Sequence, residues 1–285
     1  MQLSSLAMIL TASVAHAVWN IASKYKKEDT LVFVWAYSCT SALLWVPISL
    51  ILIVNGQQNF NWQLVVAALI SSILHIAYSL ILQSGYERVE LGIVYPIARG
   101  SGPVLTILFA TLFMGEQLSA HALFGALLVI AGIFVVTGNP FRSRSRPLQG
   151  LLWGAVTGAG IACYTLWDGY SVITLHLEPV SYYASTILLQ SLIMTPAVMR
   201  RQHHIQTVVR IDIIPILIIA VCSPLAYILV LTAMQSMPLA LVAPLRESSI
   251  VIGSLFSYYL FRENHLARRI AGAVVVLSGI AVISL

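Results

Sequence analysis

Charged side chains are scarce in this sequence. Asp, Glu, Lys and Arg together make up 9% of its 285 residues, whereas 59% are hydrophobic and the mean hydropathy is +0.91. A water-soluble domain carries roughly 25% charged residues, so this chain has too few of them to cover a soluble surface. The composition therefore excludes an ordinary soluble enzyme or binding domain and indicates an integral membrane protein.

Motifs for catalysis, metal binding and nucleotide binding are also lacking. The three cysteines, Cys39, Cys163 and Cys222, lie in apolar runs without a CxxC partner or a nearby histidine at metal-binding spacing. We therefore interpret them as small buried hydrophobic residues. The sequence contains no Walker A, HExxH or GxSxG motif. We therefore predict no catalytic residues, no metal, no cofactor and no ATP coupling within this chain.

Apolar runs dominate what remains. A membrane-spanning helix needs roughly 20 mostly apolar residues, and short polar breaks between such runs force antiparallel helical hairpins. Ten candidate spans cover residues 3–24, 31–54, 62–84, 90–113, 118–138, 149–173, 179–199, 211–234, 238–261 and 265–285. The predicted fold class is an all-α integral membrane protein with ten transmembrane helices.

The second half of the chain repeats the first. The matched residues are Leu91 with Leu239, Val94 with Val242, Pro96 with Pro244, Glu116 with Glu263, Gly125 with Gly272, Val129 with Val276 and Gly132 with Gly279. A repeat at about half the chain length indicates duplication. We predict two five-helix repeats, residues 1–138 and 149–285, joined by a basic linker at 139–148.

The basic residues are distributed asymmetrically. Thirteen of the 15 Lys and Arg residues lie in odd-numbered loops, and the other two, Arg99 and Arg246, lie within spans. The positive-inside rule puts the odd loops in the cytoplasm and both termini outside. Five spans per repeat is an odd number, so the repeats are inverted, a common plan of secondary transporters. Because the basic residues occupy these short loops, the net charge of +5 does not indicate nucleic-acid binding.

With this organisation the chain resembles the ten-helix, EamA-like group of the drug/metabolite transporter (DMT) superfamily. The resemblance covers nearly the whole chain. It rests on two five-span halves, on a proline-bearing fourth span that ends in Gly115-Glu116 or Arg262-Glu263, and on a glycine-spaced fifth span in each half. It implies a transporter of small metabolites in which spans one, three, four, six, eight and nine enclose a cavity and spans five and ten pack outside.

Polar residues recur at helical spacing on the spans that this resemblance assigns to the cavity. A polar stripe on a spanning helix faces protein or a water-filled cavity rather than lipid. The candidate substrate-binding residues are His16, Trp19 and Asn20 in the first span, His75 in the third, Tyr95 and Arg99 in the fourth, Tyr164 and Asp168 in the sixth, Tyr227 in the eighth, and Arg246 and Glu247 in the ninth. For the histidines and aromatic residues, ordinary helix packing is the alternative.

Four charged residues, Arg99, Asp168, Arg246 and Glu247, lie well inside spans. Charge at that depth is expensive and marks a candidate functional site. An arginine suits an anionic substrate group, because its guanidinium offers a planar fork to a carboxylate or phosphonate. The alternative is a structural pair of Arg99 with Glu247 or Asp168. For Asp168 we favour a counter-ion role toward an arginine over a role in binding an amine or a coupling proton.

Small residues recur on several spans. Gly125 and Gly132, and likewise Gly272 and Gly279, are seven residues apart, and Gly154 begins a GxxxG motif. Such spacing lets helices approach closely, either within one chain or in a homodimer.

The sequence thus predicts a secondary transporter of a small polar metabolite, anionic or zwitterionic, that works by alternating access. The alternatives are a membrane-embedded enzyme and a non-transporting membrane subunit. The expected partners are a small-molecule substrate and the lipid bilayer, without nucleic acid, and a homodimer is left open. The expected location is the cell membrane, as a multi-pass protein of the bacterial inner membrane.

Overall fold

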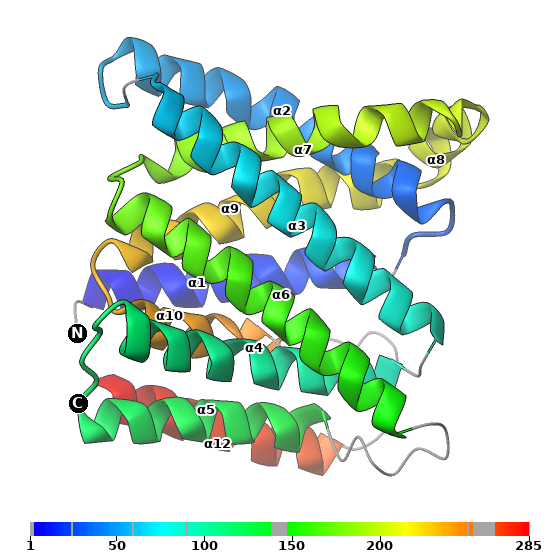
Figure 1. Ribbon diagram of the computed structural model, residues 1–285. Coiled ribbons are helices and arrows are strands. Elements are labelled where there is room, and N and C mark those ends of the chain that lie inside the picture. The colour runs from blue at the N-terminus through cyan, green and yellow to red at the C-terminus, as the bar shows by residue number, and fades with distance from the viewer. Residues whose placement is uncertain are drawn as a thin grey trace.

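The structure is a bundle of long helices that lie roughly along one direction (Figure 1). This computed structural model describes residues 3–23, 25–58, 60–88, 91–137, 147–249, 251–252 and 266–284, and every regular element in that part is helical. The helices are α1 (Leu3–Ser23), α2 (Thr30–Val54), α3 (Trp62–Arg88), α4 (Leu91–Phe113), α5 (Ala120–Thr137), α6 (Pro147–Ile173), α7 (Pro179–Met199), the 3-10 turn η2 (Gln202–His204), α8 (Ile205–Ile211), α9 (Ile213–Met234), α10 (Leu239–Arg246) and α12 (Leu266–Ser284).

Most of the predicted spans coincide with helices, with two differences. First, the polar break before α9 is not irregular, because it contains η2 and α8. Second, the ninth span, expected over 238–261, begins as α10, which ends at Arg246 with Glu247 as its C-cap, two residues beyond Pro244. A proline removes a helical hydrogen bond, and this helix ends nearby. Residues 250 and 253–261 of that span lie outside the described part.

Five helices, α1, α2, α3, α6 and α9, are long and apolar enough to cross a membrane by length and composition. The outer faces of the bundle carry many large apolar side chains, and Leu43, Val54 and Phe113 are 76%, 84% and 75% exposed. Soluble proteins rarely expose so much contiguous apolar surface, and a surrounding bilayer would cover it. The helix α7 is less apolar because it carries many Ser, Thr and Tyr residues and a glutamine.

Polar side chains end several helices. Asp29 caps α2 by accepting from the Val32 amide at 3.0 Å, and Glu178 caps α7. Glu116 accepts from the backbone amides of Leu239 and Ala240 at 2.7 and 2.9 Å, and so satisfies free donors at the start of α10. This confirms the interpretation of Glu116 as a helix-end residue, whereas its repeat counterpart lies outside the described residues.

The glycine pattern serves packing within the chain. Helices α5 and α12 lie side by side at one edge of the bundle (Figure 1). A Cβ atom on Gly125 would lie 2.7 Å from the carbonyl oxygen of Gly279, and one on Gly132 would lie 2.8 Å from the amide nitrogen of Val276. Likewise, a Cβ atom on Gly154 of α6 would lie 2.6 Å from a side-chain atom of α4. These contacts explain the glycines without a second copy of the protein.

Basic residues gather at one end of the bundle. The α1–α2 loop, the end of α3, the segment from the end of α7 through α8, and the start of α12 lie together, opposite both chain ends (Figure 1). These segments carry Lys26, Lys27, Arg88, Arg200, Arg201, Arg210 and Arg268. The segregation of charge agrees with the positive-inside pattern, and the assignment of this end to the cytoplasm stays a prediction.

Candidate functional site

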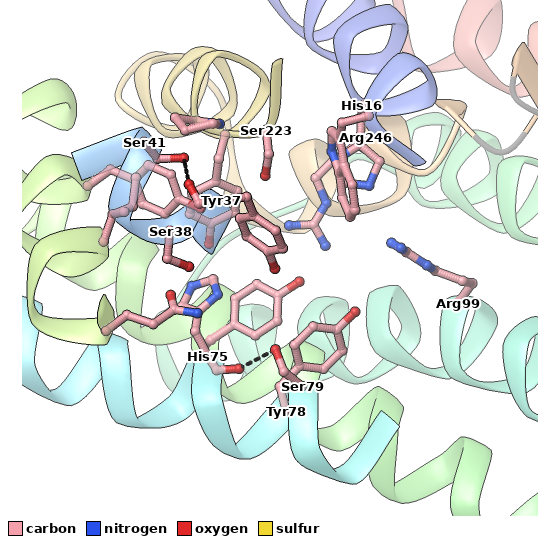
Figure 2. A pocket seen from close by; sticks show the side chains of 17 residues that line it. His16, Tyr37, Ser38, Ser41, His75, Tyr78, Ser79, Arg99, Ser223 and Arg246 are labelled. Atoms are coloured by element: carbon pink, nitrogen blue, oxygen red, sulfur yellow. Dashed lines mark hydrogen bonds between the residues drawn. The ribbon is translucent and has the colours of Figure 1, made fainter. Parts of the chain in front are cut away.

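A polar cavity of about 110 Å³ lies in the middle of the bundle. Its lining residues come from α1, α2, α3, α4, α6, α7, α9 and α10, so both halves of the chain contribute to it. Figure 2 shows Arg99 and Arg246 on one side of this space and Tyr37, Ser38 and Ser41 on another. The cavity thus has a cationic side and a side rich in hydroxyl groups.

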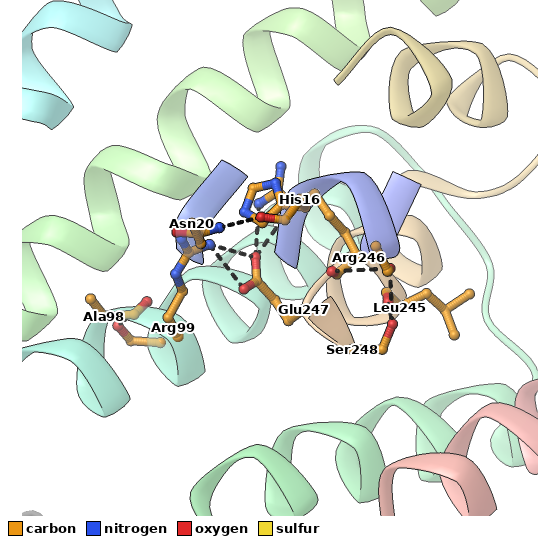
Figure 3. Close-up of polar contacts among 10 residues, drawn as sticks. His16, Asn20, Ala98, Arg99, Leu245, Arg246, Glu247 and Ser248 are labelled. Atoms are coloured by element: carbon orange, nitrogen blue, oxygen red, sulfur yellow. Dashed lines mark hydrogen bonds and ion pairs between the residues drawn. The ribbon is translucent and has the colours of Figure 1, made fainter. Parts of the chain in front are cut away.

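The cationic side is an arrangement of two arginines around one carboxylate (Figure 3). Nη1 of Arg99 lies 3.0 Å from Oε2 of Glu247, and Nη2 of Arg246 lies 3.1 Å from its Oε1. Arg99 is 7% exposed, Arg246 is 3% exposed and Glu247 is fully buried. Arg99 and Glu247 are therefore in contact, as the structural-pair alternative requires, and Arg246 joins them. Whether the pair is structural or binds substrate stays open. The formal charge of the three side chains together is +1.

Local structure explains how the arginines and the glutamate meet. Arg99 lies near the middle of α4, and Arg246 is the last residue of α10. Because α10 ends there, Glu247 occupies the C-cap position and its side chain reaches both guanidinium groups. Arg99 and Glu247 align in the repeat that the sequence predicts, and their contact joins the first half of the chain to the second.

Two ring nitrogens beside the arginines have no hydrogen-bond partner among the described residues. They are Nε2 of His16 and Nε1 of Trp19, and both atoms are buried. The two rings belong to α1, line the cavity and lie 4.8 Å apart between centroids. A buried polar atom without a partner is costly, so these nitrogens are suited to bond to a molecule in the cavity. Asn20 is not in the cavity lining, and its amide donates to the carbonyl of His16 at 2.7 Å.

In the described part of the chain, the contacts of Asp168 are with two tyrosines and a histidine rather than with an arginine, so they do not support the counter-ion interpretation. Its carboxylate accepts from the hydroxyl groups of Tyr182 and Tyr227, each at 2.6 Å, and lies 3.0 Å from Nε2 of His75. Asp168 is fully buried and lies behind the cavity wall, whereas His75 lines it. The sequence could not distinguish these partners, because the choice depends on which side chains α3, α7 and α9 bring to α6.

Aromatic rings connect the histidine to the arginines. The ring of His75 stacks on Tyr164 with centroids 4.2 Å apart, and the Arg246 guanidinium carbon lies 5.9 Å from the centroid of the same tyrosine. Tyr227 packs against Tyr183 with centroids 4.7 Å apart. Tyr164 and Tyr227 thus line the cavity on the histidine side, and Trp19 lines it on the arginine side.

The structure brings most of the sequence-predicted site residues together. Those that line the cavity are His16, Trp19, His75, Arg99, Tyr164, Tyr227 and Arg246. Glu247 and Asp168 lie directly behind lining residues, and Asn20 lies beside His16. Tyr95 lies on α4, and its side chain is outside the described part.

Sequence reasoning missed the contributions of α2 and α7. The resemblance placed the cavity among six other spans, yet Tyr37, Ser38 and Ser41 of α2 line it, as do Tyr183 and Gln190 of α7. The two α7 residues are seven positions apart and so share one helix face. The same polar-stripe test applied to the seventh span would have found them. In the described part, no group of three or more His, Cys, Asp or Glu residues is placed to hold a metal ion.

Comparison with known proteins agrees with this architecture. The chain matches the EamA-like transporter family over residues 3–138 and 148–285. A solved crystal structure, described only as that of a protein, is similar with a TM-score of 0.77 and 14% sequence identity, over 99% of this chain and 96% of the other. At that identity the likeness shows the fold alone.

The class that fold and cavity define is a membrane protein with a polar, charged centre. The chain belongs to the EamA-like transporter family. It is a transmembrane protein of the drug/metabolite transporter type, in a family of transporters rather than of enzymes.

Proposed function

We propose that this protein is a secondary transporter that moves a small anionic or zwitterionic metabolite across the cell membrane by alternating access. The observation that carries the proposal is the pair of buried arginines that share Glu247 and line a cavity between the helices. A guanidinium is always charged and offers a fork of donors to a carboxylate, phosphonate or sulfonate. An anionic group that enters the cavity would add a second acceptor for these donors.

The cavity lining also limits the character of the substrate. The unpartnered nitrogens of His16 and Trp19 lie beside the arginines, and the hydroxyl groups of Ser38 and Ser41 lie on another side. We therefore infer a substrate with an anionic head and a polar body that bonds to these groups.

Helix contacts support two inverted five-helix repeats, residues 1–138 and 149–285, with the linker at 139–148. In that scheme α1 to α5 correspond to α6, α7, α9, α10 and α12. Helix α3 contacts α6, and the corresponding pair, α9 and α1, is also in contact. Helix α3 contacts α7 as α9 contacts α2, while α2 packs on its own counterpart α7, and α5 on its counterpart α12. A pseudo-two-fold axis gives this pattern, because exchanging the halves leaves the contacts unchanged.

Two loop contacts support the same symmetry. Gln58, before the third helix of the first half, accepts from the amide of Glu178 at 2.6 Å in the first loop of the second half. Asp212, before the third helix of the second half, accepts from the amide of Glu28 at 3.1 Å in the first loop of the first half. Inverted repeats let one half rock against the other around a central site, which is a common route to alternating access.

The proposal is tested by uptake into liposomes that contain the purified protein. The probes are lactate, methylphosphonate, methanesulfonate and alanine, with choline as a cation of similar size. We expect uptake of at least one anionic or zwitterionic probe and none of choline. Selective uptake of choline would contradict the anion site. A folded protein that moves no probe would favour the alternatives of a membrane enzyme or a non-transporting subunit in the bacterial inner membrane.

A double substitution separates substrate recognition from a structural pair. If Arg99 only neutralises Glu247, the variant Arg99→Ala with Glu247→Ala restores transport that Arg99→Ala loses, apart from the loss caused by leaving Arg246 without its Glu247 contact. If Arg99 contacts the substrate, the double variant stays inactive although it folds and reaches the membrane. We expect the second result.

A further inference from the structure

The Asp168 cluster joins four helices through one carboxylate. Asp168 of α6 accepts from Tyr182 of α7 and Tyr227 of α9 and contacts His75 of α3. Bonds of 2.6 Å between a hydroxyl and an oxygen are typical of an ionised acceptor. The carboxylate is fully buried, whereas the His75 side chain is 14% exposed and lines the cavity. The cluster is thus a buried negative charge that contacts the cavity through two lining residues, His75 and Tyr227.

We propose that the His75–Asp168 pair is a proton-binding site that couples proton movement to the movement of the anion, an inference that rests on the proposed function. Neutral His75 donates its Nε2 proton to the Asp168 carboxylate, so Nδ1 is the ring position that accepts the coupling proton. The proton comes from water on one side of the membrane and returns to water on the other. No other bond is made or broken.

Charge balance supports the coupling. Arg99 and Arg246 carry two positive charges deep in the spans, and Glu247 and Asp168 carry two negative charges. With neutral His75 the sum is zero. A proton on His75 makes the sum +1, and a bound monovalent anion returns it to zero. Since net charge is costly within a bilayer, both the empty carrier and the carrier loaded with proton and anion are suited to rearrange.

The distance between the two sites is short enough for coupling. The ring of His75 stacks on Tyr164, and that tyrosine lies beside the Arg246 guanidinium. A proton on His75 adds positive charge beside the cavity, so it strengthens the attraction for an anion. By linkage, the bound anion must strengthen proton binding by the same factor.

The other ionisable groups around the pair are tyrosines and an arginine. Among the described residues they are Tyr182 and Tyr183 of α7, Tyr227 of α9, Tyr164 of α6 and Arg246 of α10. His16 also lines the cavity, but its ring packs against Trp19. Among the described lining residues, both His75 and Tyr227 contact Asp168. Of the two, only the imidazole has a second ring nitrogen that can accept a proton while the contact with Asp168 is kept, so we assign the proton exchange to His75.

Nuclear magnetic resonance of the full chain in nanodiscs, with nitrogen-15 in the histidine rings, tests proton binding without any substrate. The His75 signals are those lost in His75→Gln, and His121→Gln at the exposed start of α5 is the matched control. We expect lower pH to convert His75 from the neutral to the doubly protonated ring. Added methanesulfonate should increase the protonated fraction at fixed pH. A ring that stays in one form at every pH at which the protein is folded would overturn the proposal.

Binding of methanesulfonate or lactate, both monoanions around neutral pH, tests the coupling. One proton taken up per anion makes the affinity fall by up to about tenfold for each pH unit of increase. In His75→Gln the affinity should become nearly independent of pH, while the His121→Gln control keeps the wild-type slope. Asp168→Asn should also flatten the dependence of anion affinity on pH. If this variant does not fold, Tyr227→Phe, which removes one hydrogen bond to Asp168, should change that dependence.

The two proposals fail in different ways. A wild-type slope retained in His75→Gln would overturn the proton site while leaving anion transport intact. If no probe binds but His75 still exchanges its proton, the proton site stands and the anion selectivity is wrong.

Discussion

Replacing Glu247 with glutamine should make the protein less stable and yet bind anions more tightly. In the wild type Glu247 acts as an internal anion, because it accepts from Arg99 at 3.0 Å and from Arg246 at 3.1 Å. A substrate anion competes with it for the same donors. Glutamine keeps the size of the side chain and one acceptor oxygen but removes the negative charge.

The structure sets the size of both effects. Leaving buried guanidinium groups without their carboxylate costs about 3–5 kcal/mol of folding free energy, a large fraction of the ~5–15 kcal/mol typical of a domain. An anion that touches the same guanidinium groups would lie roughly 5 Å from the Glu247 carboxylate. Two like charges at that separation repel by about 3 kcal/mol at an effective dielectric constant of 20. Removing this repulsion lowers the Kd of a monoanion by about 100-fold.

Thermal unfolding of the purified protein, with and without methanesulfonate, measures both quantities. A ligand stabilises the folded state according to the ratio of its concentration to its Kd, so the rise in Tm should be larger in Glu247→Gln than in the wild type. The matched control is Glu116→Gln, the same chemical change at a carboxylate that caps α10 outside the cavity. This control should lose about 1 kcal/mol without any gain in its response to the anion. Equal responses in both variants would refute the competition.

Three further predictions concern parts of the molecule outside the cavity. Gly125→Ala should lower stability by about 1–3 kcal/mol, because its Cβ would lie 2.7 Å from a carbonyl oxygen of α12. The control is Gly160→Ala, whose Cβ would have its nearest neighbour 3.6 Å away and which should be neutral or stabilising in the same thermal assay. Although partial burial raises the pKa of Asp29, hydrogen bonds from the Val32 amide and Arg201 outweigh it and hold that pKa below its usual value. The stability that Asp29 contributes is therefore present above about pH 4 and lost as the pH falls further. Asp29→Asn should lose less stability over this acid range than the wild type. An equal loss of stability in both proteins would contradict this. A reporter fused at the C-terminus should report the non-cytoplasmic side and one in the central basic linker the cytoplasm, with the reverse pair of results overturning the orientation.

The helical architecture was largely predictable from the sequence, because lipid imposes one rule on every segment. A span must be apolar and must satisfy its backbone hydrogen bonds internally, so runs of about 20 apolar residues mark helices directly. The regular structure between α7 and α9 was missed because a short helix such as α8 carries no comparable signal. The end of α10 at Arg246 was missed because the apolar run resumes a few residues later, at Ile250-Val251-Ile252, so the sequence reads as one long span.

The candidate site was predictable in its members but not in its pairings. Charge inside an apolar run identified Arg99, Arg246 and Glu247 without a structure, since such charge is costly elsewhere. The partners of Asp168 depended on how α6 rotates toward its neighbours, and no spacing along the chain encodes that rotation. Tyr183 was missed because the family resemblance implied a cavity lined by other spans.

The most direct test of the account is the transport of anions by variants of Arg246. Uptake of lactate, methylphosphonate and methanesulfonate into liposomes should be compared for the wild type, Arg246→Ala and Arg246→Lys, with Arg201→Ala, an exposed arginine outside the spans, as the control. A buried, hydrogen-bonded charge contact contributes about 2–5 kcal/mol, so Arg246→Ala should reduce uptake of the transported anion by at least about 30-fold. Lysine should restore little of it, because it lacks the planar fork, and the control should transport normally. Wild-type uptake by folded Arg246→Ala would contradict the claim that this arginine recognises the substrate.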